Sequence, residues 1–132
     1  GDPRVRVCSV FQRDLYPFGT GHSHSGAGID LPLPMGAGGP MMREAVESSL
    51  LPVLHDFEPE MVFVSAGFDA HAQDDVADMR YTDSDFDWLT RRILEVAEQH
   101  ASGRLVSLLE GGYALGALGR CAASHVKILA GL

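Results

Sequence analysis

Residues 61–71, with the sequence MVFVSAGFDAH, decide the fold of this chain. The first five form a nearly continuous apolar run of strand length. Such a run is typical of a strand that is buried on both faces in a parallel sheet. Asp69 comes just after the end of this predicted strand, where α/β folds gather their ligands. Asp69 is therefore the first candidate functional residue.

The segments on either side of this stretch predict an α/β domain. Downstream, helical spacing over 82–101, with Thr82 as its cap, precedes a second buried strand over 104–109 and a last helix over 115–129. Upstream lie a strand over 4–11, a glycine-rich loop over 12–39 with an extended piece at 29–33, and a helix over 40–56 that Pro52 kinks or splits. This alternating order predicts a parallel sheet.

Composition excludes several functional classes. The chain has 132 residues, enough for one domain, and its net charge of -8 argues against direct nucleic-acid binding. Two cysteines do not make a disulfide framework, so we expect Cys8 and Cys121 to be buried free thiols. No apolar run suits a membrane span and no signal peptide is visible, so we expect a cytoplasmic protein. The abrupt start at Gly1, without a Met, suggests a fragment or a processed chain.

Position alone leaves the chemistry of the strand-end residues open. Asp69 can bind a metal, act as a base or cap a turn, and His71, two residues on, offers a second ligand. Gly111 and Gly112 follow the second strand and let the backbone approach a ligand closely. The next residue, Tyr113, is more often a packing residue than a catalytic one when judged by position. His22 and His24 form an H-x-H pair in the long loop, where histidines are usually solvated.

Two motifs in combination carry a resemblance to a known family. The segment VSAGFDAH at 64–71 and the segment LEGGY at 109–113 resemble the zinc-dependent histone deacetylase and acetylpolyamine amidohydrolase family, most closely its class II and bacterial members. Residues 15–21 and 26–28 are similar to the aromatic, glycine-rich active-site loop of that family. The resemblance implies an arginase-like α/β fold with a parallel sheet flanked by helices, of which residues 1–132 are the C-terminal part.

The resemblance also implies roles for particular residues. Zinc in the family is held by two carboxylates and one histidine, and Asp69 matches the last carboxylate, whereas His71 is not a ligand there. Tyr113 matches the tyrosine whose hydroxyl stabilises the tetrahedral oxyanion. The remaining implied positions line the tunnel for the acyl chain: Phe18 or Tyr16 as an aromatic wall, Val76 at the rim, and Gly111 and Gly112 in the backbone wall.

The chain departs from the family pattern in two places. Phe18 stands between Pro17 and the Gly-Thr-Gly triplet that starts at Gly19, where the family usually has proline directly before the triplet. The other two zinc ligands and the paired histidines lie upstream in the family, and this chain has no His-His pair. We therefore expect the isolated chain to bind zinc poorly or not at all and to be inactive.

Two kinds of function remain at this point. The first is a zinc-dependent deacetylase that acts on acetylated lysine or acetylated amines, with no membrane partner and with homo-oligomerisation left open. The alternative is a non-catalytic α/β binding or assembly module that retains the same scaffold. An arginase-like hydrolase shares the fold, but the Gly-Gly-Tyr motif, here at 111–113, disfavours it.

Overall fold

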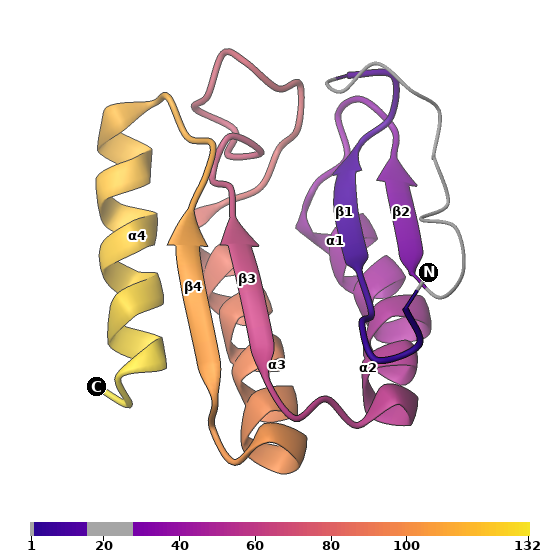
Figure 1. The fold of residues 1–132 in the computed structure, drawn as a ribbon. Coiled ribbons are helices and arrows are strands. Elements are labelled where there is room, and N and C mark those ends of the chain that lie inside the picture. The colour runs from indigo at the N-terminus through magenta and orange to yellow at the C-terminus, as the bar shows by residue number, and fades with distance from the viewer. Residues whose placement is uncertain (1, 16–27) are drawn as a thin grey trace.

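The computed structural model describes residues 2–15 and 28–132. Strands and helices alternate in the order that the sequence predicts (Figure 1), and the α/β class with parallel strands flanked by helices is confirmed. The elements are β1 Cys8–Gln12, β2 Ile29–Leu33, α1 Gly39–Ala45, a π-helical turn Val46–Leu50, α2 Leu51–Phe57, β3 Val62–Ala66, α3 Asp83–Ala101, β4 Leu105–Leu109 and α4 Leu115–Leu129.

The strands form two parallel pairs within the described residues. β1 pairs with β2, and β3 pairs with β4 in a register that sets Val62 opposite Leu105 and Ala66 opposite Leu109. Because β3 and β4 run in the same direction, their carboxyl ends meet at one edge (Figure 1). The segments that carry Asp69 and Tyr113 leave the sheet at this edge, as the sequence predicts.

Pro52 shapes the helical segment between β2 and β3. Proline has no N–H and its ring disturbs the preceding turn of an α-helix. The chain passes from α1 into the π-helical turn just before Pro52, and the N–H of Leu51 bonds to the carbonyl of Val46, five residues back. The helical segment therefore continues through a widened turn into α2 and is not split at Pro52. No helix in the described ranges is long and apolar enough to cross a membrane.

The core lies between α1, α3 and the loop after β3. Met42 and Val46 are fully buried, and Phe68 packs against Phe86 with their ring centroids 5.2 Å apart. Thr82 is the N-cap residue of α3 as predicted and forms a capping box with Asp85, whose carboxylate accepts the N–H of Thr82 at 2.8 Å. The two cysteines are free thiols; Cys121 is buried and Cys8 half-buried. The loop after β3 is thus fixed by the same core that holds the helices.

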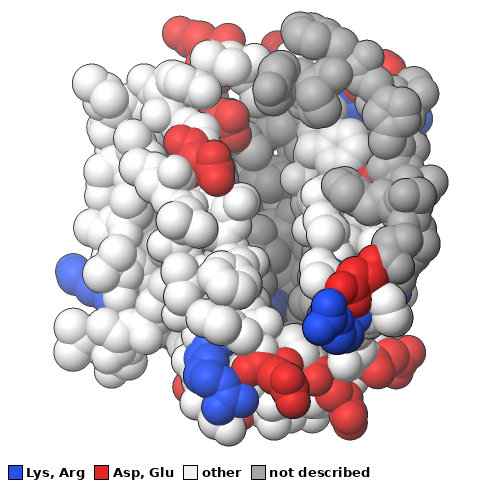
Figure 2. Space-filling view, viewed as in Figure 1, with Lys and Arg blue, Asp and Glu red and all other residues white. Residues whose placement is uncertain are grey.

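One expectation about the sheet is wrong. The apolar run in β3 predicts burial on both faces, yet Phe63 is 67% exposed and Ser65 is also exposed. Their partners across the strand pair, Val106 and Leu108, are exposed as well. In Figure 1 α3 runs behind β3 and β4, and Figure 2, from the same side, shows no charged side chains over the middle of these strands. The helices of this chain therefore cover one face of the pair and leave an apolar face open.

Candidate active site

Asp69 lies in a tight turn that follows β3. The side chain of Phe68 is buried in the core, and its N–H donates to the carbonyl of Gly111 at 2.8 Å. This bond extends the contact between the β3 and β4 segments past the ends of both strands. The carboxylate of Asp69 lies directly against Gly111: a Cβ added to Gly111 would come within 2.3 Å of Oδ2. The absence of a side chain at 111 therefore creates the space that the carboxylate occupies.

The Asp69 carboxylate is unusual among the acids near the sheet edge. Asp74, Asp83 and Asp85 all accept hydrogen bonds from neighbouring groups. Within residues 2–15 and 28–132, no hydrogen bond or ion pair is found for the side chain of Asp69, which is half-buried. A half-buried carboxylate with both oxygens uncommitted can take a cation as a ligand. It fits one position of a zinc site.

Tyr113 leaves the end of β4 through the two glycines. Gly112 has a φ of 138°, which side chains rarely adopt, and a Cβ there would lie 2.9 Å from Cδ1 of Leu118. Glycine at 112 is therefore required both by the backbone and by the packing of α4. Tyr113 is 61% exposed, so burial in the core does not account for its presence. Its phenol is available to a molecule bound at this edge.

A loop of polar residues connects the two motifs. Val76 is 51% exposed at its surface, where the sequence places a rim residue. Asp74 is buried beneath it and accepts hydrogen bonds from the N–H groups of Val76, Tyr113 and Ala114. Burial would raise the pKa of Asp74, but the three N–H donors outweigh it and hold the pKa below its usual range. From the sequence alone the loop is rich in aspartate, and nothing distinguishes Asp74 from the other aspartates in it.

Several predicted residues cannot be placed. Tyr16 and Phe18, the candidate tunnel aromatics, lie outside the described residues, as do His22 and His24. The roles of Asp69, Tyr113, Val76, Gly111 and Gly112 stay predictions. A Cβ at Gly111 would collide with Asp69 and a Cβ at Gly112 would press on Phe68, so the backbone passes close to both residues.

Both ring nitrogens of His71 bond to residues other than Asp69. Its Nδ1 accepts the N–H of Gln73 at 3.0 Å, so the ring proton lies on Nε2, which donates to Asp83 at 2.8 Å. Arg120 donates to the other oxygen of Asp83 at 2.7 Å. Hydrogen bonds from Arg120 and His71 lower the pKa of Asp83 well below its usual range. His71 thus ties the loop to α3 and α4, and sequence spacing gives no sign of Arg120 in this role.

The same residues include the one trio of possible metal ligands in the described part of the chain. The ligand atoms of His71, Asp83 and Cys121 lie within 4.8 Å of one another. A metal on Nε2 of neutral His71 would require the proton on Nδ1, where the N–H of Gln73 already donates. Burial also raises the pKa of Cys121 to about 11, so the thiol is protonated. We interpret this trio as a hydrogen-bonded link between elements.

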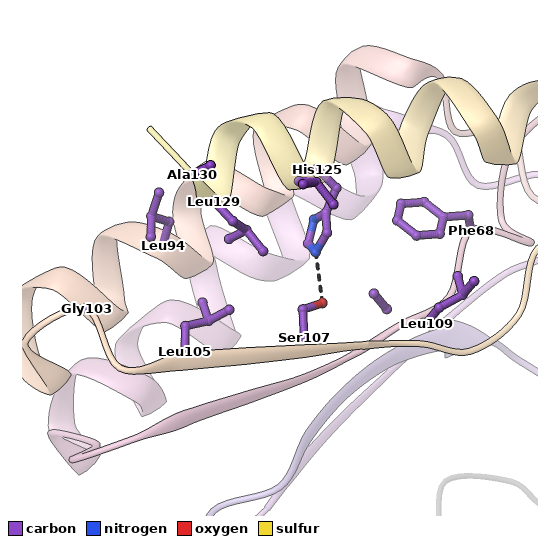
Figure 3. Close-up of a pocket in the computed structure, with 11 residues that line it drawn as sticks. Phe68, Leu94, Gly103, Leu105, Ser107, Leu109, His125, Leu129 and Ala130 are labelled. Carbon is purple, nitrogen blue, oxygen red and sulfur yellow. Dashed lines mark hydrogen bonds between the residues drawn. The ribbon is translucent and has the colours of Figure 1, made fainter. Parts of the chain in front are cut away.

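A second histidine lines a cavity of about 500 Å³ between β4, α3 and α4 (Figure 3). The Thr90 hydroxyl donates to the carbonyl of Phe86, so it accepts the proton on Nδ1 of His125 at 2.8 Å. Nε2 of His125 then accepts the Ser107 hydroxyl at 2.9 Å. A serine hydroxyl that donates to a histidine is also how a catalytic serine is activated. Ser107, however, lies inside a strand, and the group that orients His125 is the Thr90 hydroxyl instead of the usual carboxylate. We interpret the chain of bonds as structural.

His125 should make the stability of the chain depend on pH. Burial lowers the pKa of His125 below its usual value, so between that lowered pKa and about 6.5 the unfolded chain binds a proton that the native chain excludes. The stabilisation is complete above pH 6.5 and is lost as pH falls through this window. We expect urea titrations of the wild type to show a steeper loss of unfolding free energy from pH 7 to pH 5 than those of His125→Gln. Equal slopes would contradict this assignment.

Comparison with known proteins places the chain in a family. The model of the histone deacetylase domain matches residues 1–129. The chain is 39% identical to histone deacetylase 10, chloroplastic, of Oryza sativa over 98% of its length and 31% of that protein. It is 35% identical to the histone deacetylase-like amidohydrolase of Pseudomonas aeruginosa over 74% of its length and 26% of that protein. The chain therefore spans about a third or less of these relatives.

Solved structures agree in fold. The histone deacetylase Clr3 superposes with a TM-score of 0.83 at 26% identity over 99% of this chain and 23% of its own. The HD domain of HDA15 superposes with a TM-score of 0.79 over 94% of this chain and 37% of its own. Together with the strand-end Asp69 and the Gly111-Gly112-Tyr113 turn that faces it, these matches lead to one conclusion. The chain belongs to the histone deacetylase family.

Proposed function

We propose that residues 1–132 are the C-terminal part of a single zinc-dependent deacetylase domain, which removes acetyl groups from lysine side chains or related amines. The observation that carries the proposal is the uncommitted Asp69 carboxylate, held against Gly111 where the β3 and β4 segments leave the sheet. A side chain at 111 would occupy that space. The arrangement leaves room for a half-buried carboxylate at this edge of the sheet, where it can serve as a metal ligand.

Each predicted residue has a definite task in this mechanism. Asp69 would hold the zinc as one of its ligands. Zinc, when bound, lowers the pKa of a coordinated water and polarises the acetyl carbonyl. Tyr113 donates its hydroxyl hydrogen bond to the carbonyl oxygen as negative charge develops there. Val76 at the rim, the backbone at 111–112, and one aromatic side chain, Phe18 or Tyr16, would enclose the acyl chain and exclude water.

Further polypeptide must complete this site. One carboxylate is a weak zinc site, and the one trio of possible ligands among the described residues does not include Asp69. The exposed face that carries the apolar side chains of Phe63, Val106 and Leu108 supports the same conclusion, because such a face is normally covered in a parallel sheet. We propose that the missing ligands and the missing cover belong to the same deacetylase domain, acting in the cytoplasm.

The test compares this chain with the whole polypeptide that carries it. With added zinc and an acetyl-lysine peptide, we expect turnover from the whole polypeptide and none from residues 1–132. In the whole polypeptide, Asp69→Asn should lose zinc and activity together, with the exposed Asp75→Asn as the matched control. Tyr113→Phe should keep its zinc and lose about 10² to 10³ in kcat, the usual cost of one oxyanion donor.

The alternative function gives different results. A non-catalytic module would bind no zinc in the whole polypeptide and would show no activity that depends on Tyr113. Robust turnover by residues 1–132 alone would contradict the proposal that this chain holds only part of the site.

A further inference from the structure

Asp74 links two residues that lie far from it in the chain. It is only 7% exposed, in the loop between β3 and α3. Its Oδ2 accepts the N–H of Tyr113 at 2.7 Å and the N–H of Ala114 at 2.9 Å, while its Oδ1 accepts the N–H of Val76 at 3.0 Å. One carboxylate therefore holds the backbone at the proposed oxyanion donor and at the proposed rim of the tunnel.

We propose that Asp74 is a positioning residue that sets the place of Tyr113 and of Val76 together. This inference rests on the proposed function of the site, because it explains what holds the proposed active-site residues in place. Asp74 touches neither metal nor substrate in this scheme. It acts through the backbone of the two residues that do.

The glycines before Tyr113 make such a tether necessary. Gly111 must be glycine to leave room for Asp69, and Gly112 adopts a φ of 138°. Two consecutive glycines have the widest conformational freedom of any dipeptide, so they cannot by themselves hold the residue that follows. Catalysis by a hydroxyl nevertheless requires a fixed position, because a displacement of about 1 Å can cost about 10²-fold in rate. The two bonds from Tyr113 and Ala114 to Asp74 supply the missing constraint.

The carboxylate is itself held in place. The N–H of Asp74 donates to the carbonyl of His71 at 2.8 Å, and the N–H of Ala72 donates to the carbonyl of Tyr81 at the same distance. The side chain of His71 is in turn bonded to Asp83 at the first turn of α3. The tether thus runs from a helix of the core to the backbone of Tyr113. It also reaches the residue before α4, where N–H groups have no partner in the helix and favour a negative charge.

Asparagine is the sharpest substitution at this position. All three groups that face the carboxylate are N–H donors, and an asparagine amide has only one acceptor oxygen. In Asp74→Asn the NH₂ group must face either the Val76 N–H or the pair at Tyr113 and Ala114. A donor then faces a donor on one side, although the size of the side chain is almost unchanged. Asp75→Asn changes the adjacent exposed acid and serves as the matched control.

The first measurement is kinetic and uses the whole polypeptide. We expect Asp74→Asn to lower kcat at least tenfold with zinc content unchanged, and Asp75→Asn to stay within twofold of the wild type. In a Tyr113→Phe background, Asp74→Asn should cost less than threefold, because the hydroxyl that it positions is gone. An equal loss of kcat in both backgrounds, or no loss in the wild-type background, would overturn the proposal.

The second measurement separates the tether from the proposed chemistry. Amide hydrogen exchange in residues 1–132 should be faster at Tyr113, Ala114 and Val76 in Asp74→Asn, and unchanged in α1, α2 and the strands. Unaltered exchange at Tyr113 and Ala114 would refute the tether even if deacetylation were absent. If Asp74→Asn does not fold, Asp74→Glu keeps the charge and moves it by one methylene, and the same two outcomes are expected from it. Failure of the proposed function would instead appear as a whole polypeptide whose activity ignores Tyr113→Phe, with the exchange result intact.

Discussion

If the proposed deacetylase function holds, Gly111→Ala is expected to abolish most of that activity in the polypeptide that carries this chain while leaving the chain folded. The added methyl group would lie 2.3 Å from Oδ2 and 2.7 Å from Cγ of Asp69, so the carboxylate must move. Gly111 does not have a positive φ, so the effect comes from this collision and not from backbone strain. A displaced ligand of about 1 Å implies a loss in kcat/KM of about 10²-fold.

The stability of the same variant should change little. The atoms that collide are the end of a short, half-buried side chain that can rotate, so we expect a loss of about 1 kcal/mol in the free energy of unfolding. Gly119→Ala in α4 is the matched control, since a Cβ there meets nothing within 4 Å. It should keep full activity and gain about 0.5–1 kcal/mol from the better helix propensity of alanine. Full activity in Gly111→Ala would show that Asp69 is not a ligand.

Met42→Ala is expected to cause the largest loss of stability in the part of the chain that the structure describes. Met42 has no exposed surface and belongs to the central cluster with Val46 and Phe68. Removing its side chain leaves a cavity that the surrounding helices fill only in part. Replacement of a buried Met by Ala typically costs about 2–5 kcal/mol.

Met41 provides an internal control for this experiment. It is the preceding residue of the same helix, α1, and is 45% exposed, so Met41→Ala should change the free energy of unfolding by less than about 0.5 kcal/mol. Urea denaturation of both variants, followed by circular dichroism, measures the difference. Equal losses would mean that α1 does not pack in the core as described.

The elements with local signals were predicted best. Thr82 predicts the start of α3 and Gly103 follows its end, because a cap and a left-handed residue act within a few positions of themselves. The last helix begins and ends at the predicted residues, 115 and 129. The extended piece predicted at 29–33 coincides with β2, but the limits of the other strands differ from the predicted ranges by up to four residues. The ends of a strand depend on which partner residues remain within reach, which is a property of the pair.

The covering of β3 was not predictable from its own residues. A continuous apolar run indicates that both faces of a strand need to be covered. It does not reveal whether the same chain supplies that cover. Phe63 and Leu108 are therefore exposed in this chain, although the apolar composition of their strands predicts that they are buried. His125 illustrates the same limit, since Ser107 and Thr90 reach it from two other elements.

The sequence by itself determined the family, the order of strands and helices, and the two strand-end motifs that carry Asp69 and Tyr113. These follow from periodicity, capping and short motifs, all of which act over a few neighbouring residues. Only the tertiary structure decided that Asp69 rests uncommitted against Gly111, and that Asp74 holds Tyr113 from 39 positions away. Such contacts arise because parallel strands bring their carboxyl ends to one edge, and the distances there are set by packing across the whole fold.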